Sequence, residues 1–175
     1  MLSTCMPADA CWPNSTAWAA LNASTSGALA LPGTPAFANA SAMKYPNWQF
    51  AEGHKSSPSA LPSYALLVRG VADVQAAVRF AAERNVRLAI KSTGHTYTGR
   101  STAAGSLLLY LHEMRDVQQH DAFDDGCGGA SGPPAVSVQP GVDFGTLYPA
   151  VDKRGLVVVG GGGFTVGSAG GYLAG

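Results

Sequence analysis

The most reactive side chain in a glycine-rich stretch of this sequence is His95, within residues 91–101, KSTGHTYTGRS. These residues follow the apolar run VRLAI at 86–90, so the pattern predicts a loop after a strand. A neutral imidazole nitrogen is a competent nucleophile, and Gly94 lets the backbone press against a flat ring. A lone histidine is more often an ordinary hydrogen-bonding residue, and on the residues alone both interpretations stay open.

A second glycine-rich segment, GGGGFTVGSAGG at 160–171, follows the apolar run LVVV at 156–159. Glycines let backbone N–H groups approach phosphate oxygens, so the two segments could hold a diphosphate from two sides. No P-loop motif occurs. The sequence ends before the position, about 20 residues further on, where a regular dinucleotide fingerprint needs an acidic residue. Glycine-rich segments also form plain turns and linkers, and that alternative stays open.

Composition narrows the class of partner. Eleven basic and 11 acidic residues leave a formal net charge of zero, which argues against a nucleic-acid binder. No apolar stretch approaches the length of a membrane span, so we expect no membrane partner. The other histidines lack the spacing of metal ligands, and we predict no metal site: His54, His112 and His120.

Sequons and cysteines near the N-terminus favour a secreted glycoprotein. Asn14, Asn22 and Asn39 each begin an N-x-S/T sequon, and Cys5 and Cys11 lie beside them. The cysteine count is three, so one thiol is free or pairs elsewhere, and the sequence does not assign the pairing. The start has no signal-peptide pattern, and the end, GGYLAG, stops in mid-pattern, so we expect a partial sequence.

The elements that must position the two loops are expected after residue 60. YALLV at 64–68 predicts a short buried strand, and residues 71–85 have apolar side chains at helical spacing. Strands at 86–90 and 106–111 follow. The order of these segments predicts a β-α-β unit.

Residues 1–60 are rich in Ala, Ser, Asn and Pro and show no long periodicity. We expect a short helix there, capped by Asn14 or Ser15, with Trp18 and Leu21 on one face. The remainder is expected to be an extended arm that lies over another surface.

The later part of the chain alternates loop, strand and helix. Residues 118–134 are expected to be an inserted loop, and 135–142 a strand that ends in a Pro-Gly turn. Residues 143–155 predict a helix capped by Asp143 and bent by Pro149, followed by a strand at 156–159. Its inward side chains are expected to be Phe144, Leu147 and Val151.

Two stretches, VADVQAAVRFAAERNVRLAIKSTGHTYTGRS and VVVGGGGFTVGSAGGYLAG, resemble the FAD-binding domain of the vanillyl-alcohol oxidase and p-cresol methylhydroxylase (PCMH) family. The berberine-bridge-like secreted oxidases are the branch that they resemble most. In that family the flavin loop has the pattern basic-x-x-Gly-His-x-x-x-Gly-x-Ser. Lys91, Gly94, His95, Gly99 and Ser101 meet that pattern here.

The resemblance implies an α+β fold of the PCMH type. It implies an N-terminal arm at 1–60 and an incomplete FAD-binding domain at 61–175, holding the first subdomain and part of the second. The substrate domain of the family would lie outside this sequence.

The resemblance also implies FAD as the cofactor, bound covalently through His95 to the 8α-methyl carbon of the flavin. Bicovalent members add a cysteine just before the later loop's TVG, where this chain has Gly163, so a single attachment is expected. The cofactor-binding residues that it implies are Ser92, Thr93, Gly94, His95, Thr96, Tyr97, Ser101, Pro140, Gly141, Gly163, Thr165, Val166, Gly167, Gly170 and Gly171.

The reaction implied is oxidation of a C–H bond next to oxygen or nitrogen in a small molecule, with O2 as the electron acceptor. The general base of the family lies in the following domain, so no catalytic residue is assigned, and the fragment alone is expected to be inactive. Two alternatives stay open. In one, His95 only lines a non-covalent FAD site. In the other, the chain is a non-catalytic secreted glycoprotein whose glycines only make turns.

Overall fold

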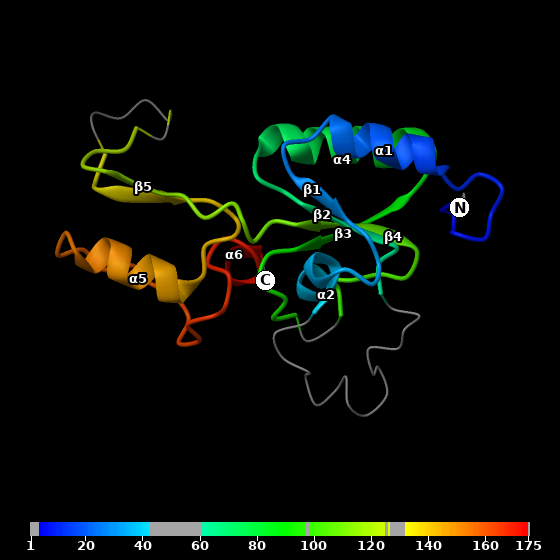
Figure 1. Ribbon diagram of the computed structural model, residues 1–175. Coiled ribbons are helices and arrows are strands. Elements are labelled where there is room, and N and C mark those ends of the chain that lie inside the picture. The colour runs from blue at the N-terminus through cyan, green and yellow to red at the C-terminus, as the bar shows by residue number, and fades with distance from the viewer. Residues whose placement is uncertain (1–3, 43–60, 97–98, 125, 127–131, 175) are drawn as a thin grey trace. The chain divides into compact units, whose positions relative to one another are not determined.

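The computed structural model describes residues 4–42, 61–96, 99–124, 126 and 132–174 (Figure 1). These residues form two compact units, Met1–Glu113 and Met114–Gly175. The first unit holds a four-stranded sheet with helices on both faces, and the second holds a two-stranded sheet with a helix. The α+β fold that the sequence predicts is confirmed.

The sheet of the first unit has the strand order β1-β2-β4-β3. Strands β2 (Tyr64–Leu67), β4 (Ser106–Tyr110) and β3 (Arg87–Lys91) are parallel, and β1 (Ala28–Ala30) is antiparallel to β2. Helix α4 (Val71–Arg84) connects β2 to β3, which confirms the predicted β-α-β unit. Strand β4 lies between β2 and β3, a placement that the linear pattern does not reveal.

Burial explains the apolar run of β4. All five of its residues are buried, and Leu107 and Leu108 are fully inaccessible to solvent. A parallel strand covered on both faces needs a continuous apolar sequence rather than an alternating one. Figure 1 shows α1 (Ser15–Ala23) and α4 on one face of this sheet and α2 (Pro35–Ser41) on the other.

Side chains alternate between these two faces along each strand. On the α2 face, Phe37 and Ala40 pack in one cluster with Leu108 and Tyr110. On the other face, the indole of Trp18 stacks on Tyr64, with ring centroids 4.1 Å apart. The core of the first unit therefore has two apolar layers, one on each side of the sheet.

The N-terminal region contains more regular structure than the sequence suggests. Helix α1 is confirmed, with Asn14 as its cap: Asn14 Oδ1 accepts from the N–H of Ala17 at 2.9 Å. The expected extended arm is wrong for residues 28–41, which form β1 and α2. Thr34 caps α2 and Pro35 occupies its first turn, and both are local start signals. The domain boundary at residue 60 stays a prediction.

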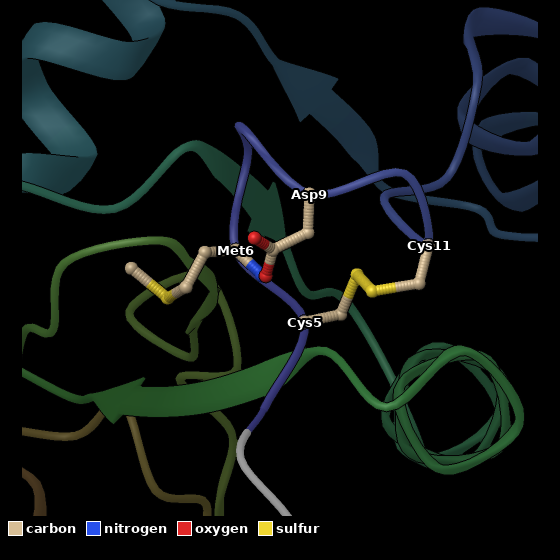
Figure 2. The surroundings of a disulfide bond; sticks show 4 residues. All are labelled: Cys5, Met6, Asp9 and Cys11. Carbon is tan, nitrogen blue, oxygen red and sulfur yellow. A yellow bond between two sulfur atoms is a disulfide. The ribbon is translucent and has the colours of Figure 1, made fainter.

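A disulfide joins Cys5 to Cys11 (Figure 2). Cys5 is buried, its backbone N–H donates to the carbonyl of Asn85 at 2.8 Å, and it forms a parallel bridge with Val86 just before β3. The turn enclosed by the disulfide also contains an internal hydrogen bond, in which Asp9 Oδ2 accepts from the N–H of Met6 at 2.8 Å. The disulfide thus closes the N-terminal turn, and the backbone of Cys5 attaches this turn to the segment just before β3.

The second unit contains β5 (Val117–His120) and β6 (Ala135–Val138), which pair antiparallel. Helix α5 (Phe144–Asp152) follows, and a short helix α6 (Gly171–Ala174) ends the unit. The predicted loop at 118–134 is wrong at its start, because residues 118–120 belong to β5. The polar side chains of residues 118–120 give no sequence signal for a strand. Pairing with β6 stabilises this strand. The predicted strand at 135–142 is confirmed as β6 for 135–138.

The helix predicted at 143–155 is confirmed as α5, which ends at Asp152 rather than at residue 155. Asp143 is the cap, and Phe144, Leu147 and Val151 are buried as predicted.

Residues 156–159 were expected to form a strand, but within the described part of the chain they pair with no other strand. Side chains alternate instead: Leu156 and Val158 pack on the α5 cluster, and Val157 and Val159 are exposed. The strand was predicted from the apolar run alone, and only Leu156 and Val158 of that run pack against the α5 cluster.

Candidate functional site

The first loop with a predicted site begins where β3 ends. Because β2, β3 and β4 are parallel, their carboxyl ends meet at one edge of the sheet, where α/β folds usually place ligand-contacting loops. Thr93 and Gly94 are buried in this loop, and His95 is half-buried. Gly94 has φ +83° and Gly99 has φ +72°, a left-handed conformation that favours glycine. The loop therefore needs glycines at these two motif positions.

Lys91 holds the base of this loop. It is only 2% exposed, its Nζ donates to the carbonyl of Ala42 at the end of α2, and the ammonium lies 4.7 Å from the centre of the Tyr110 ring. Its own carbonyl accepts from the N–H of Leu111 at 2.8 Å. A buried ammonium is costly without polar and aromatic partners, so these contacts fix where the loop starts.

His112 lies beside this loop and was given no role from the sequence. It follows β4, two residues after Tyr110, and the two rings stack with centroids 5.6 Å apart and an interplanar angle of 20°. Tyr110 is the register partner of Lys91, so His112 lies at the same carboxyl edge as residues 92–96. The available signal was strand alternation: residues two apart share a face.

The second loop is held by the first turn of α5. The N–H of Phe144 donates to the carbonyl of Val166 at 3.1 Å, and the N–H of Gly145 donates to the carbonyl of Phe164 at 2.7 Å. A turn closes between Gly163 and Val166, where the Val166 N–H donates to the Gly163 carbonyl at 3.0 Å. The first N–H groups of a helix lack partners within the helix, and here the loop supplies them.

Glycine is required where this loop crosses the aromatic side chains of α5. A Cβ on Gly160 would lie 2.3 Å from Phe144 Cε1 and 2.6 Å from the Tyr148 hydroxyl. The same hydroxyl donates to the carbonyl of Gly161 at 2.6 Å. A Cβ on Gly162 would meet nothing within 4 Å, which leaves this part of the loop open. One side of the loop is thus packed and the other is accessible.

Asp143 organises the cap of α5. Its Oδ1 accepts from the backbone N–H of Thr146 at 2.9 Å, and its Oδ2 lies 3.2 Å from an Arg115 guanidinium nitrogen. Arg115 also donates to the Thr146 hydroxyl. Burial raises the pKa of Asp143, but hydrogen bonds from Thr146 and the charge of Arg115 outweigh it, so that pKa lies below its usual value.

Pro140 and Gly141 form the turn that leads from β6 into this cap. The N–H of Gly141 donates to the carbonyl of Met114 at 2.8 Å, and the N–H of Val142 donates to the carbonyl of Gln139 at 3.1 Å. Gly141 is buried. Their role as cofactor contacts stays a prediction.

The predicted site residues divide between the two units. The loop after β3 carries Ser92, Thr93, Gly94, His95, Thr96 and Ser101. The second unit carries Pro140, Gly141, Gly163, Thr165, Val166, Gly167, Gly170 and Gly171. Tyr97 lies outside the described residues.

The donor set of the two loops fits a diphosphate cofactor. Residues 91–101 and 160–171 contain no carboxylate, and they offer backbone N–H groups, hydroxyls and the cation of Arg100, since the Lys91 ammonium is buried. Gly162, Gly163 and Thr165 are exposed, so a ligand can approach this backbone closely. The loops therefore suit an anionic group that accepts hydrogen bonds.

A metal centre has less support in the part of the chain that the structure describes. The one group of potential ligand atoms found there is Cys5, Asp9 and Cys11. Both sulfur atoms are already bonded to each other in the disulfide, as Figure 2 shows. These three residues therefore have a structural role in the N-terminal turn.

This chain is similar in sequence and fold to known FAD-linked proteins. Residues 62–175 match the family described as FAD binding domain. The FAD-linked oxidoreductase ZEB1 of Gibberella zeae is 35% identical over 98% of this chain and 35% of its own length. The VAO-type flavoprotein MtVAO615 of Myceliophthora thermophila superposes with a TM-score of 0.72 at 30% identity, covering 94% of this chain and 36% of that one.

A carbohydrate oxidase of Microdochium nivale is also similar, with a TM-score of 0.64 and 25% identity over 86% of this chain and 28% of its own. The chain thus spans about a third of the length of the proteins that it matches. The expected relationship is confirmed by the family match and by the identity to full-length oxidoreductases. This chain belongs to the FAD-binding-domain family of the VAO-type, FAD-linked oxidoreductases.

Proposed function

We propose that this FAD-binding oxidoreductase domain serves an oxidase that acts on a C–H bond next to oxygen or nitrogen in a small molecule, with O2 as the electron acceptor. The observation that carries the proposal is the pair of carboxylate-free loops, one ending β3 and one docked on α5. Similarity to a carbohydrate oxidase supports a sugar or other alcohol as the substrate class. Bound FAD would supply the two-electron oxidation.

We assign the roles of the two loops as follows. In the loop at 160–171, backbone N–H groups around Gly163 and Thr165 donate to the diphosphate. The His95 imidazole carries the flavin through a single covalent bond, because Gly163 offers no thiol for a second bond. A proton acceptor for the substrate hydroxyl or amine is assigned to no residue of this chain.

The test uses the protein expressed from its complete reading frame. Under anaerobic conditions, sugars, primary alcohols and amines are each added while flavin absorbance is followed, and air is then admitted. We expect bleaching with one of these classes, followed by recovery of absorbance and release of one H2O2 per oxidised substrate. Bleaching that air does not reverse would exclude O2 as the acceptor, and no bleaching by any class would contradict the substrate proposal.

We also propose that the protein passes through the secretory pathway and carries N-glycans. The Cys5–Cys11 disulfide indicates an oxidising compartment, and the asparagines of all three sequons, Asn14, Asn22 and Asn39, are exposed. None of the described helices has the length and apolar character that a membrane span requires. Expression in a eukaryotic secretory host should give a product whose mobility increases after peptide-N-glycosidase treatment. An unchanged mobility would contradict glycosylation.

A further inference from the structure

We propose that Asp143 is a positioning residue of the FAD site, which sets the glycine loop through the first turn of α5. The inference rests on the proposed function, because it takes the loop at 160–171 to contact the cofactor. Asp143 itself touches none of the expected ligand groups. It acts through the backbone that it organises.

The glycine loop depends on an outside support. Glycine loses more conformational freedom on ordering than any other residue, and seven of the 12 residues at 160–171 are glycines. Its carbonyls at 164 and 166 accept from the two N–H groups that begin α5. The loop therefore keeps its shape only while that first turn keeps its own.

Asp143 holds this turn from three directions. Its Oδ1 accepts from the Thr146 N–H and hydroxyl, at 2.9 and 2.7 Å, and its Oδ2 faces Arg115. Its backbone forms an antiparallel bridge with Gly167 in the loop itself. Beside it, the Ser168 N–H and hydroxyl both donate to the Val142 carbonyl, at 2.8 and 2.9 Å. Cap and loop are thus one hydrogen-bonded assembly.

This arrangement distinguishes positioning from simple stabilisation. A residue that only stabilises the fold changes FAD affinity when part of the protein unfolds, and has no effect while nearly all molecules are folded. A residue that positions the loop changes the affinity of the folded protein. The two roles separate when binding is measured well below the melting temperature of each variant.

The experiment is made with the complete gene product in a His95→Ala background, so that FAD binds reversibly whether or not His95 normally forms a bond. Asp143→Asn keeps the size of the side chain and removes the charge that faces Arg115. Asp152→Asn is the matched control, because it makes the same change at the exposed C-terminal end of the same helix. Arg115→Met removes the other partner without changing the cap residue.

Equilibrium dialysis with FAD and the visible circular dichroism of the bound flavin are measured for all variants. We expect Asp143→Asn to weaken FAD binding about tenfold and to change the flavin dichroism, since it removes the charge-assisted hydrogen bond from Arg115, and such a bond is worth about that factor. Arg115→Met should change the FAD affinity and the flavin dichroism in the same direction. Asp152→Asn should have the same affinity and dichroism as the His95→Ala protein. Equal affinity and dichroism in folded Asp143→Asn or folded Arg115→Met would overturn the inference. A His95→Ala parent that binds no FAD would instead count against the proposed function.

Discussion

His95 is the residue on which the proposed attachment of the flavin depends. It is half-buried in a loop where Gly94 takes a left-handed conformation, so the imidazole is held rather than freely exposed. Lys91 fixes the start of the same loop through Ala42 and Tyr110. A side chain held in this way can act on a ring at a set distance, which supports a direct role for the imidazole.

If His95 carries the flavin, trichloroacetic acid precipitation of the complete protein should leave a yellow pellet. Denaturation releases a non-covalent flavin but not a bonded one. His95→Ala should give a colourless pellet and a yellow supernatant, and His120→Ala is the control because that histidine lies on β5, away from both loops along the chain. A colourless wild-type pellet under a yellow supernatant would contradict the covalent bond and would favour a non-covalent FAD site.

A buried carboxylate, Asp73, gives a prediction about pH. Asp73 is 1% exposed and accepts from the N–H groups of Ser26 and Arg69, both at 2.8 Å, so it joins the segment before β1 to the segment after β2. Burial raises the pKa of Asp73, but these hydrogen bonds outweigh it and the pKa is lowered. Because the pKa of the folded state lies below that of the unfolded state, the carboxylate stabilises the fold above the unfolded value and loses that effect as pH falls through the folded value.

Asp73→Asn should lower the free energy of unfolding by about 1–3 kcal/mol at pH 7, since an amide nitrogen then faces a backbone donor. The difference from wild type should shrink as the pH falls below about 4. Urea denaturation at several pH values measures both effects, with Asp116→Asn as the exposed control. A difference that stays constant down to pH 2 would contradict the role of the ionised carboxylate.

At the scale of elements, the packing of the glycine loop on α5 distinguishes two glycines of that loop from each other. Gly160 and Gly162 are two positions apart, yet a Cβ at the first would overlap Phe144 and a Cβ at the second would face open space. A local sequence pattern treats these glycines alike. The aromatic side chains of α5 separate them.

Gly160→Ala should therefore destabilise the protein by about 1–3 kcal/mol through overpacking, and Gly162→Ala should leave its stability nearly unchanged. Thermal unfolding, followed by circular dichroism, compares the two variants directly. Equal melting temperatures for the two variants would mean that the loop does not pack on Phe144 and Tyr148 as described.

Several elements could be predicted because their signals are local. The helical spacing of α4, the Asp143 cap of α5 and the apolar run of β4 each specify structure from neighbouring residues. Strand β5 and the place of β4 in the sheet order depend on partners far away in the chain. Such pairing leaves little trace in a short window of sequence.

At the scale of the whole molecule, the chain supplies two loops of an FAD-binding domain and about a third of the length of its full-length relatives. The family motif predicts both loops from the sequence, and their contact with the cofactor stays a prediction. It could not locate the supports of these loops. Asp143 was predicted only as a helix cap, and Arg115 and Tyr148 act through contacts that only the fold creates.

The visible absorption spectrum of the complete gene product, purified under native conditions, tests the central claim most directly. The account predicts the two flavin bands near 370 and 450 nm, about one FAD per polypeptide, either as purified or after reconstitution with FAD. A folded protein that is colourless as purified, and that stays colourless after incubation with FAD and gel filtration, would contradict it.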